Sequence, residues 1–179
     1  MLEVCEDLET DGFDVTYLPV DENGKVDPAD IEDAIRDETI LISIMAANNE
    51  IGTIAPLKEI GKIAKENQVF FHTDAVQALG YLSIDVEEMG IDLMSISAHK
   101  IYGPKGVGAL YVRRRNPKVK LEPLLHGGGH ERGWRSGTLN VPSIVGFAKA
   151  VEMADRNMEE RTSHVDELTT YMWERLNDE

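Results

Sequence analysis

Several residue types that mark particular protein classes are scarce in this sequence of 179 residues. A single cysteine, Cys5, excludes an internal disulfide and a structural zinc site built on several thiolates. With 7 prolines and 15 glycines, the chain is neither collagen-like nor of low complexity. No apolar run reaches the roughly 18 residues of a membrane-spanning helix, and no secretory signal opens the sequence. We therefore expect a cytoplasmic protein without membrane contact.

Positive charge is also scarce. The 18 lysines and arginines stand against 33 acidic residues, which gives a formal net charge of −15. Such a chain repels phosphate backbones and anionic lipid surfaces, so nucleic acid is not an expected partner. Hydrophobic residues make up 42% and charged residues 28%, a composition typical of a globular domain that buries a core.

The first half of the sequence alternates apolar runs with helical patterns. Residues 15–20 read as a short strand, and Asp27 and Pro28 read as the cap and first position of a helix. Residues 39–46 form an almost unbroken apolar run, which predicts a central strand buried on both faces. A second helix is expected from Pro56, followed by a strand at 69–73 that ends in Asp74.

The next segments complete the predicted sheet. A short helix at 85–89 precedes a strand at 92–97, and strands that alternate with helices indicate parallel strands with crossover helices. About nine residues separate 97 from the next run, 107–112, which is too few for a helical crossover, so that strand is expected to be antiparallel. The predicted fold class is three-layer α/β with a mixed, mostly parallel sheet.

The remainder of the chain is predicted to be a helical arm. Ile144, Ala148, Val151 and Ala154 recur at helical spacing, and the pattern continues to Leu176. We expect residues 1–140 to form the core and residues 141–179 to lead to a further domain, because the apolar stripe of the arm has to be covered.

Polar clusters follow three of the predicted strands, at 48–52, 72–77 and 97–100. The carboxyl ends of parallel strands meet at one rim, which is where open α/β sheets bind ligands. Lys100 there offers an amine for an imine, and Asp74 offers a carboxylate for a protonated ring nitrogen. Ser97 and His99 add donors that suit a phosphate.

Three long segments carry a resemblance to a known family. They are MAANNEIGTIAP, HTDAVQALGYLSIDVEEMGIDLMSISAHKIYGPKGVGALYVRR and LHGGGHERGWRSGTLNV. In order and spacing they resemble cysteine desulfurases of the NifS/IscS type, within the class V aminotransferases of fold type I, and the likeness extends over the whole chain. It implies the large domain of such an enzyme, with pyridoxal 5'-phosphate as cofactor.

The resemblance also implies roles for single residues. Lys100 matches the lysine that binds the cofactor covalently and later moves the substrate Cα proton. Asp74 matches the partner of the pyridine nitrogen. The other cofactor-binding positions are Asn49 and Gln77 at the phenolic oxygen, Ser97 and His99 at the phosphate, and Thr138, which serves the phosphate of the other subunit of a homodimer. No metal site is implied.

The family pattern extends beyond both ends of this chain. A phosphate loop and a ring-stacking histidine precede it, and a small domain with a substrate-binding arginine and a persulfide-forming cysteine follows it. The implied reaction converts L-cysteine to L-alanine and passes sulfur to acceptor or scaffold proteins of iron-sulfur assembly, or to thiolated tRNA. For residues 1–179 alone we expect little or no turnover.

Other interpretations of these residues stay open. Asp74 could be a strand-end cap, and Asn49 could serve only its own turn. His126 and His130 could suggest a metal pair. Arg132 and Arg135 could bind an anion or form structural ion pairs, and the role of His72 is not assigned.

Four further positions are expected to be structural. Residues 113–115, three arginines, are predicted to be a solvated strand end, and Cys5 a buried small hydrophobe. At the level of the whole chain, another class V reaction, such as an aminotransferase or a selenocysteine or kynurenine lyase, or a scaffold without catalysis, remains the alternative function.

Overall fold

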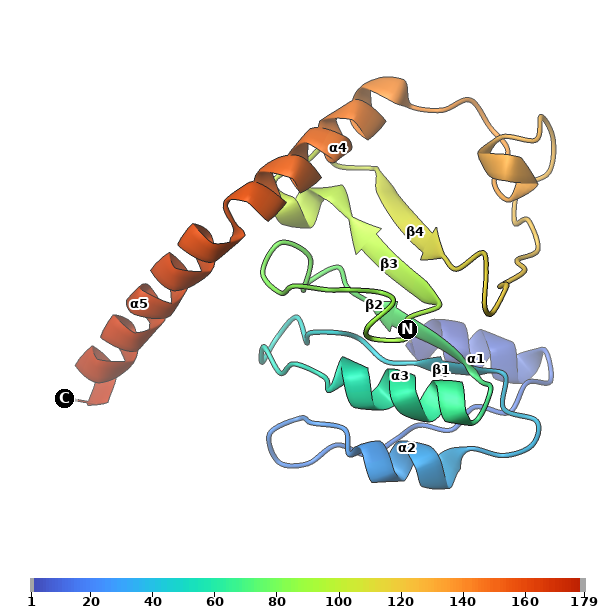
Figure 1. Cartoon of the computed structure of the whole chain (residues 1–179), viewed down its shortest axis with the longest axis horizontal. Helices are drawn as coiled ribbons and strands as arrows, with labels where there is room; N and C mark the ends of the chain where they lie inside the picture. The colour runs from blue at the N-terminus through green and yellow to red at the C-terminus, as the bar shows by residue number, and fades with distance from the viewer. Residues whose placement is uncertain (1, 178–179) are drawn as a thin grey trace.

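A four-stranded sheet is the centre of the computed structural model, which describes residues 2–177 (Figure 1). Its strands lie in the order β1 (Leu41–Ser43), β2 (Phe70–Asp74), β3 (Leu93–Ser97) and β4 (Gly108–Val112). β1, β2 and β3 are parallel, and β4 is antiparallel to β3. The prediction of a mixed, mostly parallel sheet is confirmed.

Two helices build the main core with the sheet. α2 (Pro28–Ala34) begins where the Asp27 carboxylate accepts the Ala29 N–H at 2.9 Å, as predicted. α3 (Leu57–Glu66) begins after Pro56 and packs against both α2 and β2. Their apolar faces and the sheet enclose a buried cluster that includes Ile31, Ile42, Ile60, Phe71 and Ile91.

The C-terminal part is helical, as predicted, and consists of α4 (Val141–Arg156) and α5 (Met158–Asn177). Figure 1 shows α5 extending away from the sheet, and α5 has no buried residue. Positions 178 and 179 of the predicted arm lie outside the described residues. No helix among residues 2–177 has the length and apolar character to cross a membrane.

The face through which α4 packs agrees with the predicted stripe at Val151 and Ala154 but differs from it in the first turns. Phe147, Ala150 and Ala154 are buried, whereas Ile144 and Ala148 are exposed. The reason is the close approach of α4 to the segment after β3. A Cβ added at Gly146 would lie 2.7 Å from the ring of Pro104, so small residues decide which face makes contact.

Two predicted strands differ from the structure. Residues 15–20 form no strand, because no described strand pairs with them and Pro19 has no N–H to donate. The run 39–46 yields only the short β1, which lies at an edge of the described sheet and not at its centre. Beyond β1 the chain still follows β2, since the N–H groups of Ile44 and Ala46 bond the carbonyls of His72 and Asp74.

Three smaller expectations are also corrected. The segment 85–89 is a single hydrogen-bonded turn that ends at Gly90 with a positive φ of 62°. Arg113 is buried, so it is not part of a solvated strand end, while Arg114 and Arg115 are exposed as predicted. Cys5 lies in α1 (Leu2–Thr10) and is partly exposed, because α1 buries none of its residues.

Candidate functional site

The three polar clusters singled out in the sequence lie at one rim of the sheet. β1, β2 and β3 run in the same direction, so the segments that follow them leave from the same edge. Figure 1 shows these segments on the left of the sheet, ending in the short helix η1 (Ala98–Ile101) beside α4. This rim is the candidate site.

The segment after β1 is a tight loop closed by Asn48. Its side-chain oxygen accepts the N–H groups of Glu50 and Ile51 at 2.8 and 3.0 Å, and its own N–H bonds the carbonyl of Thr53. The local turn role considered for Asn49 therefore belongs to Asn48. The Asn49 side chain is exposed and makes no hydrogen bond to any described residue.

Asp74 ends β2 with a half-buried carboxylate. One oxygen, Oδ1, accepts the N–H of Val76 at 2.9 Å, which is the local cap expected of a strand-end aspartate. Within residues 2–177 the second oxygen accepts no hydrogen bond. Gln77, one turn further along, is half-buried and has no side-chain partner in the same range. The rim therefore presents a carboxylate oxygen that is available to a ligand.

The segment after β3 carries Ser97, His99 and Lys100. The Ser97 hydroxyl lies 2.8 Å from Nδ1 of His99, and Lys100 in η1 is exposed without an ion pair to any described residue. Tyr102 then adopts a left-handed conformation, with φ of 64°, and the N–H of Gly103 closes the turn on the carbonyl of Ala98.

Strand register places Asp74 and Ser97 on one face. Ser95 lies directly opposite Asp74. Ser97 is two residues further along β3, so it shares that face about 7 Å beyond Ser95. Lys100 follows three residues later. The rim thus carries, in this order, the Asp74 carboxylate, the Ser97–His99 pair and the Lys100 amine.

His72 is held on the same face by two partners that the sequence did not indicate. Its Nδ1 lies 2.7 Å from the Ser43 hydroxyl of β1, and its Nε2 lies 3.0 Å from the Ser95 hydroxyl of β3. Burial lowers the pKa of His72, and the charge of Asp74 opposes this shift. The register of three strands, which the sequence does not specify, brings these side chains together.

The loop between β4 and α4 lies away from this rim. Figure 1 shows the orange segment with η2 (Glu131–Gly133) on the other side of the sheet from η1. Thr138, at the end of this loop, is exposed. Three residues later the chain enters α4.

The arginines and histidines of this loop have local or no partners in the described range. Arg135 donates to the carbonyl of Gly137 at 3.0 Å, and neither Arg132 nor Arg135 forms an ion pair there. His130 accepts the N–H of Gly137 at 3.3 Å, and His126 is exposed. Among residues 2–177 no group of three or more potential metal ligands forms.

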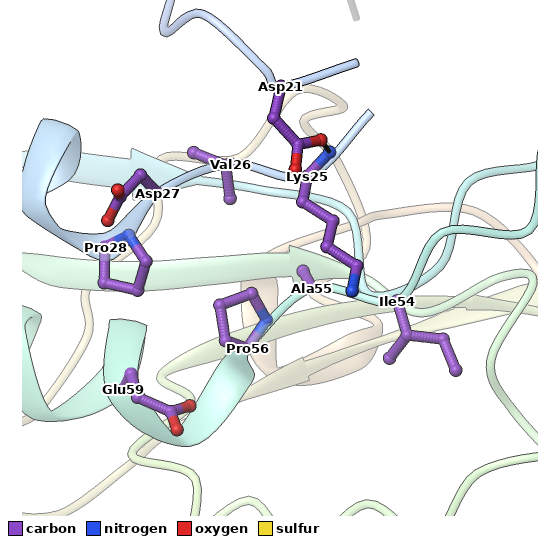
Figure 2. Close-up of a pocket in the computed structure, with 9 residues that line it drawn as sticks. All are labelled: Asp21, Lys25, Val26, Asp27, Pro28, Ile54, Ala55, Pro56 and Glu59. Atoms are coloured by element: carbon purple, nitrogen blue, oxygen red, sulfur yellow. Dashed lines mark hydrogen bonds between the residues drawn. The ribbon is translucent and has the colours of Figure 1, made fainter. Parts of the chain in front are cut away.

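A separate open pocket of about 670 Å³ lies beyond the β1 edge (Figure 2). It is bounded by the turn at Asp21 and Lys25 on one side and by Ile54, Pro56 and Glu59 on the other. In Figure 2 the Lys25 side chain extends toward Ala55 and Ile54. None of the candidate rim residues lines this pocket, so we do not assign the site to it.

Comparison with known proteins supplies a family and close relatives. The model of the aminotransferase class-V family matches residues 1–179. A cysteine desulfurase IscS from Methanosarcina thermophila is 61% identical over 89% of this chain, and the match covers 39% of that protein. The chain therefore spans well under half of the length of such relatives.

Solved structures also resemble this chain, and again it covers less than half of each. One titled "NIFS-LIKE PROTEIN" superposes with a TM-score of 0.94 and 44% identity, over 99% of this chain and 48% of that one. Another, titled "SspA in complex with cysteine", has a TM-score of 0.81 and 52% identity, over 84% of this chain and 43% of that one.

Proposed function

Because the chain belongs to the aminotransferase class-V family, we propose that it is the cofactor-binding core of a pyridoxal-phosphate-dependent cysteine desulfurase. The support is the similarity to proteins named cysteine desulfurase, together with the likeness to a structure titled "SspA in complex with cysteine". The chain spans only part of those proteins, so the activity proposed is that of the whole enzyme: L-cysteine gives L-alanine, and sulfur passes to a cysteine thiol and then to iron-sulfur assembly.

The residues of the rim fit this cofactor. The observation that carries the proposal is that, within residues 2–177, one Asp74 oxygen accepts no hydrogen bond and the Lys100 amine on the same rim forms no ion pair. A carboxylate suits a protonated pyridine nitrogen, an amine suits an aldehyde, and the Ser97–His99 pair offers donors for a phosphate. Asn49 and Gln77, whose amides have no partner in the described range, would serve the phenolic oxygen.

The cofactor, when bound, supplies a ring that withdraws electrons from the substrate Cα. Asp74 would hold the ring nitrogen in its protonated form through its own negative charge. Lys100 would hold the cofactor covalently, and after the substrate amine takes its place, the free lysine amine would accept the Cα proton. Its exposed position at the end of η1 leaves room for that exchange.

We also propose the division of the chain and its pairing in the whole enzyme. Residues 1–140 would form the cofactor-binding core and residues 141–179 the arm toward a further domain. Thr138 would bind the phosphate in the site of a second subunit, which makes the working enzyme a homodimer. The likeness of the segment LHGGGHERGWRSGTLNV to the family pattern supports this assignment.

Titration of the purified chain with pyridoxal phosphate tests the proposed cofactor. We expect the long-wavelength absorbance that the aldehyde acquires when it condenses with a lysine amine. Lys100→Ala should abolish this absorbance. Lys105→Ala, which removes an exposed lysine of the same loop, should leave it unchanged. Equal loss in both variants, or full absorbance in Lys100→Ala, would contradict the assignment.

A further inference from the structure

His72 occupies a position that the proposed reaction leaves without a role. It lies two residues before Asp74 on β2, so the two side chains share the face of the sheet that leads to the rim. Its ring spans three strands by bonding Ser43 of β1 and Ser95 of β3 through its two nitrogens. A neutral imidazole has one donor and one acceptor nitrogen, so two hydroxyl groups satisfy it completely.

Ser95 is the residue directly opposite Asp74 in the β2–β3 pair. Neighbouring strands lie only about 4.8 Å apart, so a serine hydroxyl at this position can reach a carboxylate. A hydroxyl bond to an ionised carboxylate is roughly twice as strong as one between neutral groups. The Ser95 hydroxyl nevertheless bonds Nε2 of His72 at 3.0 Å, and the Asp74 carboxylate accepts only the Val76 N–H within residues 2–177.

We propose that His72 is a positioning residue: in the tautomer with its proton on Nδ1, its Nε2 accepts the Ser95 O–H and so keeps one carboxylate oxygen of Asp74 free for the cofactor. The inference rests on the proposed role of Asp74 at the ring nitrogen. A serine bonded to Asp74 would compete with that nitrogen for the same oxygen. The Ser43 bond at Nδ1 fixes the ring in the plane that presents Nε2 to Ser95.

The burial of His72 agrees with this role. Burial lowers the pKa of its ring, although the charge of Asp74 acts in the opposite direction. A lowered pKa favours the neutral ring, which has no positive charge to pair with Asp74. Its two hydroxyl partners and Asp74 are the polar groups that the structure places against it on β1, β2 and β3.

The affinity of four variants for pyridoxal phosphate tests the proposal. His72→Phe keeps a ring but frees Ser95, and we expect the Kd to rise about tenfold, the worth of one charge-assisted hydrogen bond. Adding Ser95→Ala to that variant should restore the Kd to within about twofold of the wild type. Ser95→Ala alone leaves Asp74 free and should bind almost normally, whereas Ser43→Ala loosens the His72 ring and should raise the Kd by less than His72→Phe does.

The double variant separates positioning from mere structural support. If His72 only stabilised the fold, removing the Ser95 hydroxyl would not restore the affinity, and that result would overturn the proposal. An unchanged Kd in His72→Phe would overturn it equally.

The carboxyl ¹³C resonance of Asp74 in the cofactor-free chain gives a second readout that does not depend on cofactor binding. We expect it to move in His72→Phe and to return in the double variant. Ser95→Ala alone should leave it unchanged, and a shift there would contradict the proposal even if His72→Phe failed to fold. A chain that shows these resonances but binds no cofactor would refute the proposed function and not the role of His72.

Discussion

The charged side chain of Arg113 is buried. Its side chain is 7% exposed and bonds Asp92, which is equally buried, at 2.9 Å. Further bonds reach both oxygens of Glu87 and the carbonyls of Val86 and Ile91. The guanidinium thus ties the end of β4 to the turn before β3, and each of its donors faces an acceptor.

Replacement of Arg113 by methionine should lower the free energy of unfolding by about 3 kcal/mol, because Asp92 would remain buried without a counter-charge. Urea denaturation followed by circular dichroism measures the change. Arg114→Met is the matched control, since Arg114 is exposed, and it should change stability by less than about 0.5 kcal/mol. Similar losses in the two variants would contradict this account of the ion pair.

For single residues, the sequence shows which side chains could act but not how deeply each one is buried. Three consecutive arginines at 113–115 look alike, and only the position of the 85–90 turn against the end of β4 buries the first of them. The sequence indicates the rim residues because polar side chains follow strands that are predicted to be parallel. The contacts of His72 with Ser43 and Ser95 could not be found, since they depend on register.

Among the helices, α3 approaches the turn before β3 more closely than a side chain would permit. A Cβ built on Gly61 would lie 1.9 Å from the carbonyl oxygen of Met89. Gly90, at φ of 62°, faces the Gly61 backbone from the turn. Two glycines therefore set the spacing between this helix and the loop that leads into β3.

Gly61→Ala should destabilise the chain, although alanine is the better helix former by about 1 kcal/mol. We expect a net loss of about 1–3 kcal/mol, because backbone atoms have to move apart. The midpoint of thermal unfolding is the measurement. Lys65→Ala, at an exposed site of the same helix, should be neutral or slightly stabilising. A rise in stability for Gly61→Ala would contradict the account, because it would show that the backbone at Met89 moves apart at little cost.

The elements themselves differ in how far the sequence predicts them. Capping residues and the spacing of apolar residues predict most of the elements, namely α2, α3, β2, β3 and β4. The apolar run that contains β1 predicts a central strand with both faces covered. In the described sheet, however, β1 pairs with one strand only, β2. The prediction failed because the apolar pattern of a strand does not specify which strands pair with it.

For the whole molecule, the sheet brings three chain segments to one rim, where α4 packs against η1, while α5 extends beyond it without a buried residue. α5 buries no residue and exposes Leu168, Tyr171 and Trp173, among others. The chain matches 39% of the length of its Methanosarcina thermophila relative. The proposed cofactor binding is therefore the feature to measure on these residues, because it does not need the sulfur-accepting cysteine.

Covalent mapping of the cofactor tests the central claim most directly. The chain is incubated with pyridoxal phosphate, the bond to lysine is reduced with borohydride, and the peptides are analysed by mass spectrometry. The account predicts the added mass on the peptide that contains Lys100, and a marked decrease in labelling when Asp74 is replaced by asparagine, while Asp33→Asn, at an exposed site, has no effect. Label spread over exposed lysines such as Lys25 and Lys105, with no preference for Lys100, would contradict it.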